Sequence, residues 1–197
     1  MGLSNLSLPL ILGTNRQDRA SENVARWVHA QMLKREGISS RFFDVRDFEL
    51  PRDDYGTGIS GLFPDWRDAV LQGDGLVIVT PEYNHGYPGI LKSVLDVLLK
   101  EYIHKAVAFV SVSAGLWGGT RVVEAMLPVA RELGLAVTFT DLNFPSVKTK
   151  FNENGELLDA AYERRAAGFL DELEWMARAL KWGRENLPSK HHPLPAA

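Results

Sequence analysis

The spacing of apolar residues changes repeatedly along the chain. Five short runs are rich in apolar residues, which is typical of strands buried on both faces of a parallel sheet. We expect these strands at residues 8–12, 40–45, 76–80, 106–112 and 136–140. Longer segments with apolar residues at helical spacing lie between and after them. We expect helices at residues 21–35, 65–71, 89–99, 120–133 and 157–182.

This alternation of strands and helices predicts an α/β fold. Strands that alternate with helices form a parallel sheet covered on both faces, which is a three-layer sandwich. Five strands fit the flavodoxin-like order 2-1-3-4-5 better than the longer sheet of dinucleotide-binding folds. We expect a single domain over residues 1–186 and a flexible tail at residues 187–197.

Composition narrows the class of protein. The 197 residues are 45% hydrophobic and 24% charged, as in ordinary soluble globular proteins. A net charge of -3 argues against nucleic-acid binding. The absence of cysteine excludes disulfides and thiolate metal ligands, and it fits a cytoplasmic setting. No segment has the length of a membrane span, we see no signal peptide, and the Asp and His spacing predicts no metal site.

The loop after the first strand is a candidate anion site. Residues 13–23 place backbone N–H groups and a helix N-terminus at the edge of the sheet, where an anion is favoured. Thr14 and Ser21 add hydroxyl groups, and Arg16 or Arg19 can add a charge-assisted pair. The loop has neither the P-loop pattern nor G-x-G-x-x-G. Taken alone, it is equally well explained as a polar loop before a capped helix.

Two further loops follow the third and fourth strands. Residues 81–92 contain two tyrosines, a histidine and a Pro-Gly turn, which suit a flat ring with polar edges. Residues 113–121 contain three glycines, which permit close backbone approach or simply form a flexible turn. Open α/β sheets bind ligands at the carboxyl ends of their strands. We therefore expect all three loops to line one crevice.

The motifs in these loops carry a family resemblance. They are Gly13-Thr14-Asn15-Arg16 with Ser21, Pro81-Glu82-Tyr83-Asn84 with residues 88–93, and the segment 113–121. The chain resembles the NAD(P)H-dependent FMN reductase family, which is flavodoxin-like and includes quinone, azo-dye and chromate reductases. The resemblance covers about residues 8–145, and the second motif is the most specific of the three.

The resemblance implies FMN as cofactor and NADPH or NADH as electron donor. It implies no catalytic acid or base, because hydride passes from the nicotinamide to flavin N5. It also implies a small-molecule electron acceptor of the quinone type and a homodimer or homotetramer. The residues it assigns to FMN are Thr14, Arg16, Ser21 and Asn23 at the phosphate, Pro81, Glu82, Tyr83 and Asn84 beside the isoalloxazine, and Ser113 and Gly115 near the ring or ribityl chain.

Two other functions remain open at this stage. The first is a flavodoxin-like electron carrier without a nicotinamide site, although such carriers have more strongly acidic surfaces than this chain. The second is a hydrolase or transferase that binds a phosphorylated ligand, although no Gly-x-Ser-x-Gly elbow is present. The sequence does not distinguish NADPH from NADH, retained from released FMN, or a dimer from a tetramer, and it does not identify the acceptor.

Overall fold

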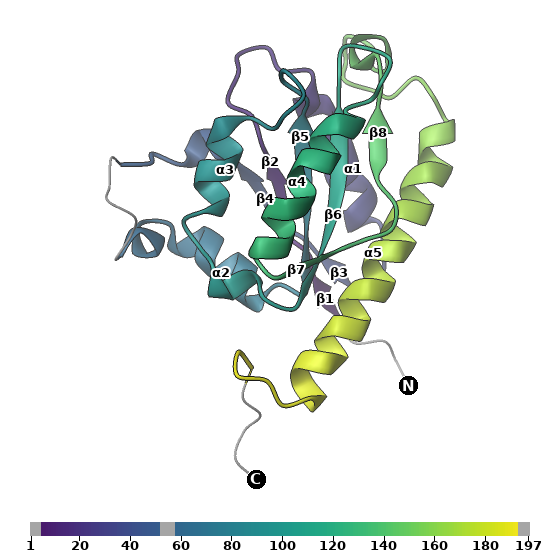
Figure 1. Cartoon of the computed structure of the whole chain (residues 1–197). Coiled ribbons are helices and arrows are strands. Elements are labelled where there is room, and N and C mark those ends of the chain that lie inside the picture. Colours follow the sequence, from purple (N-terminus) through teal and green to yellow (C-terminus); the bar gives the residue numbers. More distant parts are fainter. Residues whose placement is uncertain (1–4, 52–57, 193–197) are drawn as a thin grey trace.

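A parallel sheet forms the centre of the computed structural model, which describes residues 5–51 and 58–192 (Figure 1). Its main path runs β4-β2-β5-β6-β7, and every pairing is parallel. In the numbering of the five expected strands this is the order 2-1-3-4-5, so the predicted flavodoxin-like topology is confirmed. The strands are β2 (Leu10–Leu12), β4 (Phe42–Asp44), β5 (Gly75–Pro81), β6 (Lys105–Val112) and β7 (Leu135–Val137).

The first expected strand is interrupted at its proline. A short β1 (Leu6–Ser7) pairs with β3 (Ile38–Ser39), and β2 begins only after Pro9. Proline has no N–H to give to a ladder, so it sits at breaks and edges of sheets. Its carbonyl still accepts a hydrogen bond from the N–H of Val77 at 2.9 Å, which keeps the chain against β5.

The fifth expected strand is also divided, so its predicted span of residues 136–140 was wrong. β7 pairs with the first half of β6, and β8 (Leu142–Phe144) pairs with the second half. Between them the chain leaves the ladder at residues 138–141. The Thr138 hydroxyl donates to the carbonyl of Thr140 at 3.3 Å, and such local side-chain bonds compete with strand pairing. Phe139 consequently points outward and is 91% exposed.

The helices cover the two faces of the sheet unequally. α1 (Ser21–Leu33) and α5 (Ala161–Asn186) pack on the face that carries Leu10 and Leu12. The other face carries Ile11 and is covered by three helices, which are α2 (Pro64–Gln72), α3 (Gly89–Leu95) and α4 (Thr120–Glu132). Successive strand residues point to opposite faces, so both cores draw on the same strands.

Two helices, α3 and α5, begin or end four residues away from their expected bounds, and the other three agree within two residues. α3 stops at Leu95 instead of Leu99, because the N–H groups of Val97 and Leu98 bond to carbonyls only three residues back. α5 begins at Ala161 instead of residue 157, where an isolated bridge joins Phe151 to Leu157. None of the described helices is long and apolar enough to span a membrane.

The chain after α5 turns back toward the sheet. His192 lies 3.1 Å from the carbonyl oxygen of Ile103, and the rings of His191 and His192 contact that of His104. The last part of the expected tail, residues 193–197, lies outside the described residues, as do residues 1–4 and 52–57.

Candidate functional site

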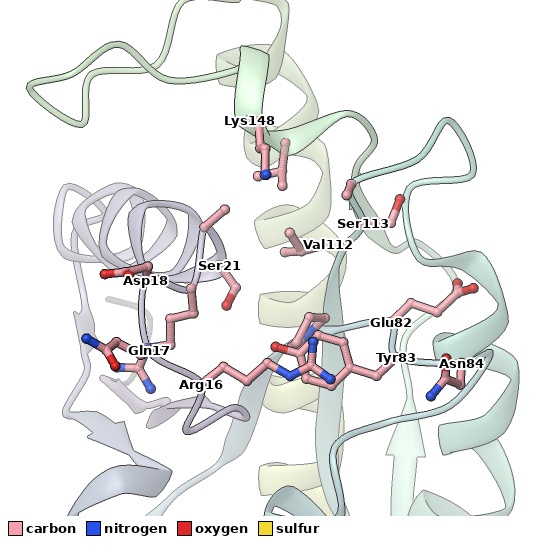
Figure 2. A pocket seen from close by; sticks show the side chains of 15 residues that line it. Arg16, Gln17, Asp18, Ser21, Glu82, Tyr83, Asn84, Val112, Ser113 and Lys148 are labelled. Carbon is pink, nitrogen blue, oxygen red and sulfur yellow. The ribbon is translucent and has the colours of Figure 1, made fainter.

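The carboxyl ends of β2, β5 and β6 open into a cavity of about 470 Å³ (Figure 2). The three loops singled out in the sequence supply most of its lining, as expected. A further wall comes from the segment after β8, which contributes Val147 and Lys148. Seven of the residues predicted to bind the cofactor line this cavity, namely Arg16, Ser21, Pro81, Glu82, Tyr83, Asn84 and Ser113.

Three predicted residues do not line it. Thr14 is fully buried, and its hydroxyl lies 2.9 Å from the hydroxyl of Tyr83. Asn23 lies beside Gly155. The carbonyl of Gly115 accepts the Ser113 hydroxyl at 2.8 Å, so it shapes the loop. Thr14 and Gly115 thus act on the lining indirectly, through Tyr83 and Ser113.

The first turn of α1 carries a buried hydroxyl without a hydrogen-bond partner. Ser21 is the first residue of α1 and only 2% exposed, and its Oγ has no partner among the described residues. Ala20, which precedes the helix, provides no side-chain cap. Native proteins leave few buried polar groups unpaired, and a helix N-terminus favours an anion. This end of the cavity therefore fits a phosphate ester.

The two arginines of the first loop have different roles. Arg19 is buried, donates hydrogen bonds to Asp44 and to the carbonyl of Thr14, and lies 3.3 Å from Glu22. Burial alone would raise the pKa of Asp44, but hydrogen bonds from Arg19 and from the Arg46 N–H hold it below its usual value. Arg19 thus joins the loop to β4.

Arg16 remains available to a ligand. Its guanidinium lies 3.6 Å from the centre of the Tyr83 ring, which is a cation–π contact (Figure 2). Its side chain makes no hydrogen bond or ion pair within the described part of the chain. The hydroxyl bond between Tyr83 and Thr14 holds the ring in place from the other end.

The second loop contains a tight turn that the sequence analysis did not predict. Tyr83 and Gly86 exchange backbone hydrogen bonds of 2.9 and 3.0 Å. Asn84 and His85 between them both have positive φ, at 51° and 67°, which is typical of a type I′ turn. The turn directs Asn84 to the cavity, while His85 meets Arg121 at 3.0 Å.

Arg121 also faces the carboxylate of Glu82. One Glu82 oxygen, Oε1, lies 3.6 Å from the guanidinium. The other, Oε2, is buried without a hydrogen-bond partner among the described residues. Glu82 therefore keeps one acceptor free beside the cavity.

The glycine loop after β6 approaches its strand closely. Gly118 and Gly119 have φ of 66° and 84°, so of the two alternatives left open by the sequence the structure shows the close backbone approach. A Cβ on Gly119 would lie 2.9 Å from Cβ of Ser111 and 3.0 Å from the N of Val112. The Ser111 hydroxyl donates to the carbonyl of Gly118 at 2.7 Å. The loop is therefore fixed against β6.

Sequence reasoning missed several lining residues. They are Gln17, Asp18, Ala20, Val112, Ala114, Val147 and Lys148, whereas Arg19, named from the sequence as a candidate partner of the anion, lines the cavity but is paired with Asp44. Most are neighbours of predicted residues, but Val147 and Lys148 come from a separate segment. The rule that ligands bind beyond the carboxyl ends of strands could have pointed to them, since they follow the last strand. Within the described ranges no group of three or more His, Asp or Glu could hold a metal ion.

Fold and cavity together define a flavodoxin-like α/β protein with a ligand site at the carboxyl edge of its sheet. The sequence model of one family, NADPH-dependent FMN reductase, matches residues 7–148. The chain belongs to this family, and the resemblance seen in its three motifs is confirmed.

Individual relatives agree with this assignment. The chain is 36% identical over 111 residues to an NAD(P)H-dependent FMN reductase of Schizosaccharomyces pombe, covering 52% of this chain and 55% of that protein. It is 31% identical over 91 residues to a 2-hydroxy-1,4-benzoquinone reductase of Burkholderia, covering 46% and 49%. The chain thus matches about half the length of these two relatives. An FMN-dependent NADPH-azoreductase of Staphylococcus aureus is 28% identical over 173 residues, covering 83% of this chain and 91% of that protein.

Solved structures share the fold. A flavoenzyme NAD(P)H:(acceptor) oxidoreductase from Paracoccus denitrificans superimposes with a TM-score of 0.70 at 18% identity, covering 87% of this chain and 97% of that one. An NADH:FMN oxidoreductase superimposes with a TM-score of 0.63 at 20% identity, covering 96% and 95%. At these identities the likeness establishes the fold alone.

Proposed function

We propose that this protein is an NAD(P)H-dependent FMN oxidoreductase that passes electrons to small acceptors. The observation that carries the proposal is the buried, unpartnered Ser21 hydroxyl at the first turn of α1, where it opens into the cavity. A phosphate ester there would accept hydrogen bonds from this hydroxyl and from the helix N-terminus. Membership of the FMN reductase family supports FMN as the molecule that carries the phosphate.

The lining divides into parts that suit the two ends of FMN. Arg16 and Ser21 would hold the phosphate, and Asn23, which lies beside Gly155 outside the lining, would support the first turn of α1. Tyr83 and Asn84, with the loops after β5 and β6, would hold the isoalloxazine. Thr14 acts indirectly, because its hydroxyl fixes the Tyr83 ring. The remaining assigned residues, Pro81, Glu82, Ser113 and Gly115, shape the walls around the ring and the ribityl chain.

The chemistry belongs mainly to the cofactor. FMN, when bound, would supply the hydride and electron chemistry between a nicotinamide and an acceptor, and the protein would supply binding and orientation. We assign no catalytic acid or base. The turn at Asn84 borders the cavity, and the glycine loop at Gly119 holds the segment after β6 that forms another wall, so both would help to orient the ring.

The acceptor and the assembly are part of the same proposal. Relatives named benzoquinone reductase and azoreductase support a quinone-type or azo acceptor. We propose a homodimer or homotetramer, supported by Leu116 and Trp117, which are 85% and 67% exposed on the loop beside the cavity. Light scattering that finds a strict monomer would contradict this. The lack of cysteine supports a cytoplasmic setting.

One experiment tests the activity. Protein is loaded with FMN, desalted, made anaerobic and mixed with NADPH or with NADH, while the long-wavelength flavin absorption is followed. We expect rapid bleaching with at least one nicotinamide and recovery of the band when a quinone is added. Flavin that is retained but stays oxidised with both donors would contradict the proposal and favour an electron carrier. If no flavin is retained, a fluorescence titration decides whether FMN binds weakly or not at all.

A further inference from the structure

The wall of the cavity opposite α1 carries a lysine to which no role has been given. Lys148 belongs to a short 3-10 helix, Val147–Thr149, that follows β8. Backbone hydrogen bonds anchor this helix to the loop after β6, from Val147 N–H to Ser113 O at 3.1 Å and from Ser146 N–H to Gly115 O at 2.9 Å. Figure 2 shows Lys148 extending from this wall toward the cavity that Ser21 lines from the other side.

The ammonium group of Lys148 is uncommitted. It is exposed and makes no hydrogen bond or ion pair within residues 5–51 and 58–192. Its near neighbour Lys150 differs, because it lies 3.4 Å from Asp159 and over the ring of Tyr162. A lysine that lines a cavity without a carboxylate partner is available to an anion.

Other cations near the phosphate end are already engaged. Arg19 is held by Asp44 and Glu22, and Arg46 donates to the backbone carbonyls of Asn15 and Arg16. Among the described lining residues this leaves Arg16 and Lys148 as cations without an ion pair. They lie on different walls of the cavity, Arg16 with its guanidinium over the Tyr83 ring and Lys148 on the segment after β8 (Figure 2).

The charge of a phosphate monoester calls for more than one cation. Such a group carries about -1.5 to -2 charges near neutral pH. The α1 N-terminus contributes roughly half a positive charge, and Arg16 contributes one. Together these supply about +1.5, which is short of the charge of the phosphate dianion, about -2, and a second cation covers the difference. The carboxylate of Asp18, which also lines the cavity, points away from its centre (Figure 2).

We propose that Lys148 is the second cation of the phosphate subsite and that it makes the cavity prefer a flavin bearing a 5′-phosphate over riboflavin. The inference rests on the proposed function, because it takes FMN as the ligand. It adds a specificity-determining residue from a segment outside the three loops of the family motifs.

The test compares Lys148→Gln with a matched variant, Lys34→Gln. Lys34 is exposed and follows the last residue of α1, so its removal deletes the same charge about 20 Å from the first turn of that helix. FMN and riboflavin are titrated into wild type and both variants, and flavin fluorescence is followed at low and high salt. We expect Lys148→Gln to weaken FMN binding about tenfold and to leave riboflavin binding unchanged. The loss should shrink at high salt.

Three results would overturn the inference. Lys148→Gln could bind FMN as wild type does, or it could lose FMN and riboflavin equally, which would indicate a general effect on the cavity. Lys34→Gln could match Lys148→Gln, which would indicate long-range charge alone. Lys148→Arg, which keeps the charge, should bind FMN within about threefold of wild type. Failure of the proposed function is distinguishable, because wild type itself would then bind neither flavin or would retain FMN that neither NADPH nor NADH reduces.

Discussion

At the scale of single residues, two buried serines show how a binding group differs from a structural one. Ser111 is fully buried, and its hydroxyl bonds to the carbonyl of Gly118 and to the amide of Asn143, both at 2.7 Å. Ser21 is equally hidden, yet its hydroxyl has no partner in the described chain. A buried group that folding leaves unsatisfied is available to a ligand.

Substituting each serine with alanine should separate these roles. Ser21→Ala should change the free energy of unfolding by less than about 0.5 kcal/mol, because no hydrogen bond is lost, but weaken FMN binding about tenfold. Ser111→Ala should reduce stability by about 1–3 kcal/mol, because it strands the Gly118 carbonyl and the Asn143 amide. Urea unfolding and FMN titration of both variants provide the measurement. Equal stability losses would contradict the distinction.

At the scale of elements, the break between β7 and β8 leaves a carboxylate half-buried. Asp141 lies in the interrupted segment, and burial, followed by the charge of Glu124, raises its pKa to about 6. A raised acid pKa means that the folded state favours the protonated form. Below the unfolded-state pKa of about 4, Asp141 is protonated in both states and the free energy of unfolding keeps its full value. It decreases as the pH rises from about 4 to about 6, because the unfolded state ionises this group more readily than the folded state does.

Asp141→Asn should remove this pH dependence. We expect the variant to be more stable than wild type at pH 8, where the native carboxylate is ionised, and to match it at pH 3.5. Urea unfolding at both pH values measures the difference. Glu124→Gln serves as control and should give a smaller gain at pH 8, since burial is the larger cause of the shift. A gain of the same size at both pH values would contradict the assignment.

The glycine loop after β6 offers a second test at this scale. Gly119→Ala should destabilise the protein by roughly 2 kcal/mol or more. The backbone at this position has a positive φ, which a residue with a side chain disfavours, and the added Cβ would clash with β6. Gly115→Ala in the same loop should change stability by less than about 0.5 kcal/mol, since a Cβ at that position has no atom within 4 Å. Thermal or urea unfolding compares the two. A neutral Gly119→Ala would show that the loop can shift away from the strand.

At the scale of the whole molecule, the two ends of the sheet have different tasks. The carboxyl end forms the cavity, while the amino end holds an ion network around Asp74. The carboxylate of this buried residue accepts hydrogen bonds from Ser7 N–H at 3.0 Å, Lys181 at 3.2 Å and Arg184 at 2.7 Å. It thereby joins the start of β5 to β1 and to α5, far from the ligand.

Asp74→Ala should accordingly affect stability without affecting binding. We expect the free energy of unfolding to fall by roughly 2 kcal/mol. This is less than for a fully buried ion pair, because the Lys181 and Arg184 side chains are 22% and 12% exposed and solvent weakens their attraction to Asp74. FMN affinity should stay within about twofold of wild type, because β5 separates the two ends by about 20 Å. Unfolding and flavin titration test both parts. A parallel loss of affinity would show that the two ends are coupled.

The sequence predicted the features that depend on local pattern. The strand order followed from five apolar runs, and seven of ten predicted residues line the cavity because their loops leave one edge of the sheet. It did not predict features that depend on distant partners. Arg19 is withdrawn from the ligand by Asp44, 25 residues away, and Lys148 is brought to the cavity by the pairing of β8 with β6.

The division of the outer strands affects how the protein behaves at high concentration. On the two sides of the main sheet the outermost strands β4, β7 and β8 have three residues each. A long, straight outer strand would offer unpaired backbone groups to another chain, whereas short and interrupted ones give little template for such addition. The irregular segment that turns Phe139 outward thus also protects the folded molecule against strand-by-strand fibril growth.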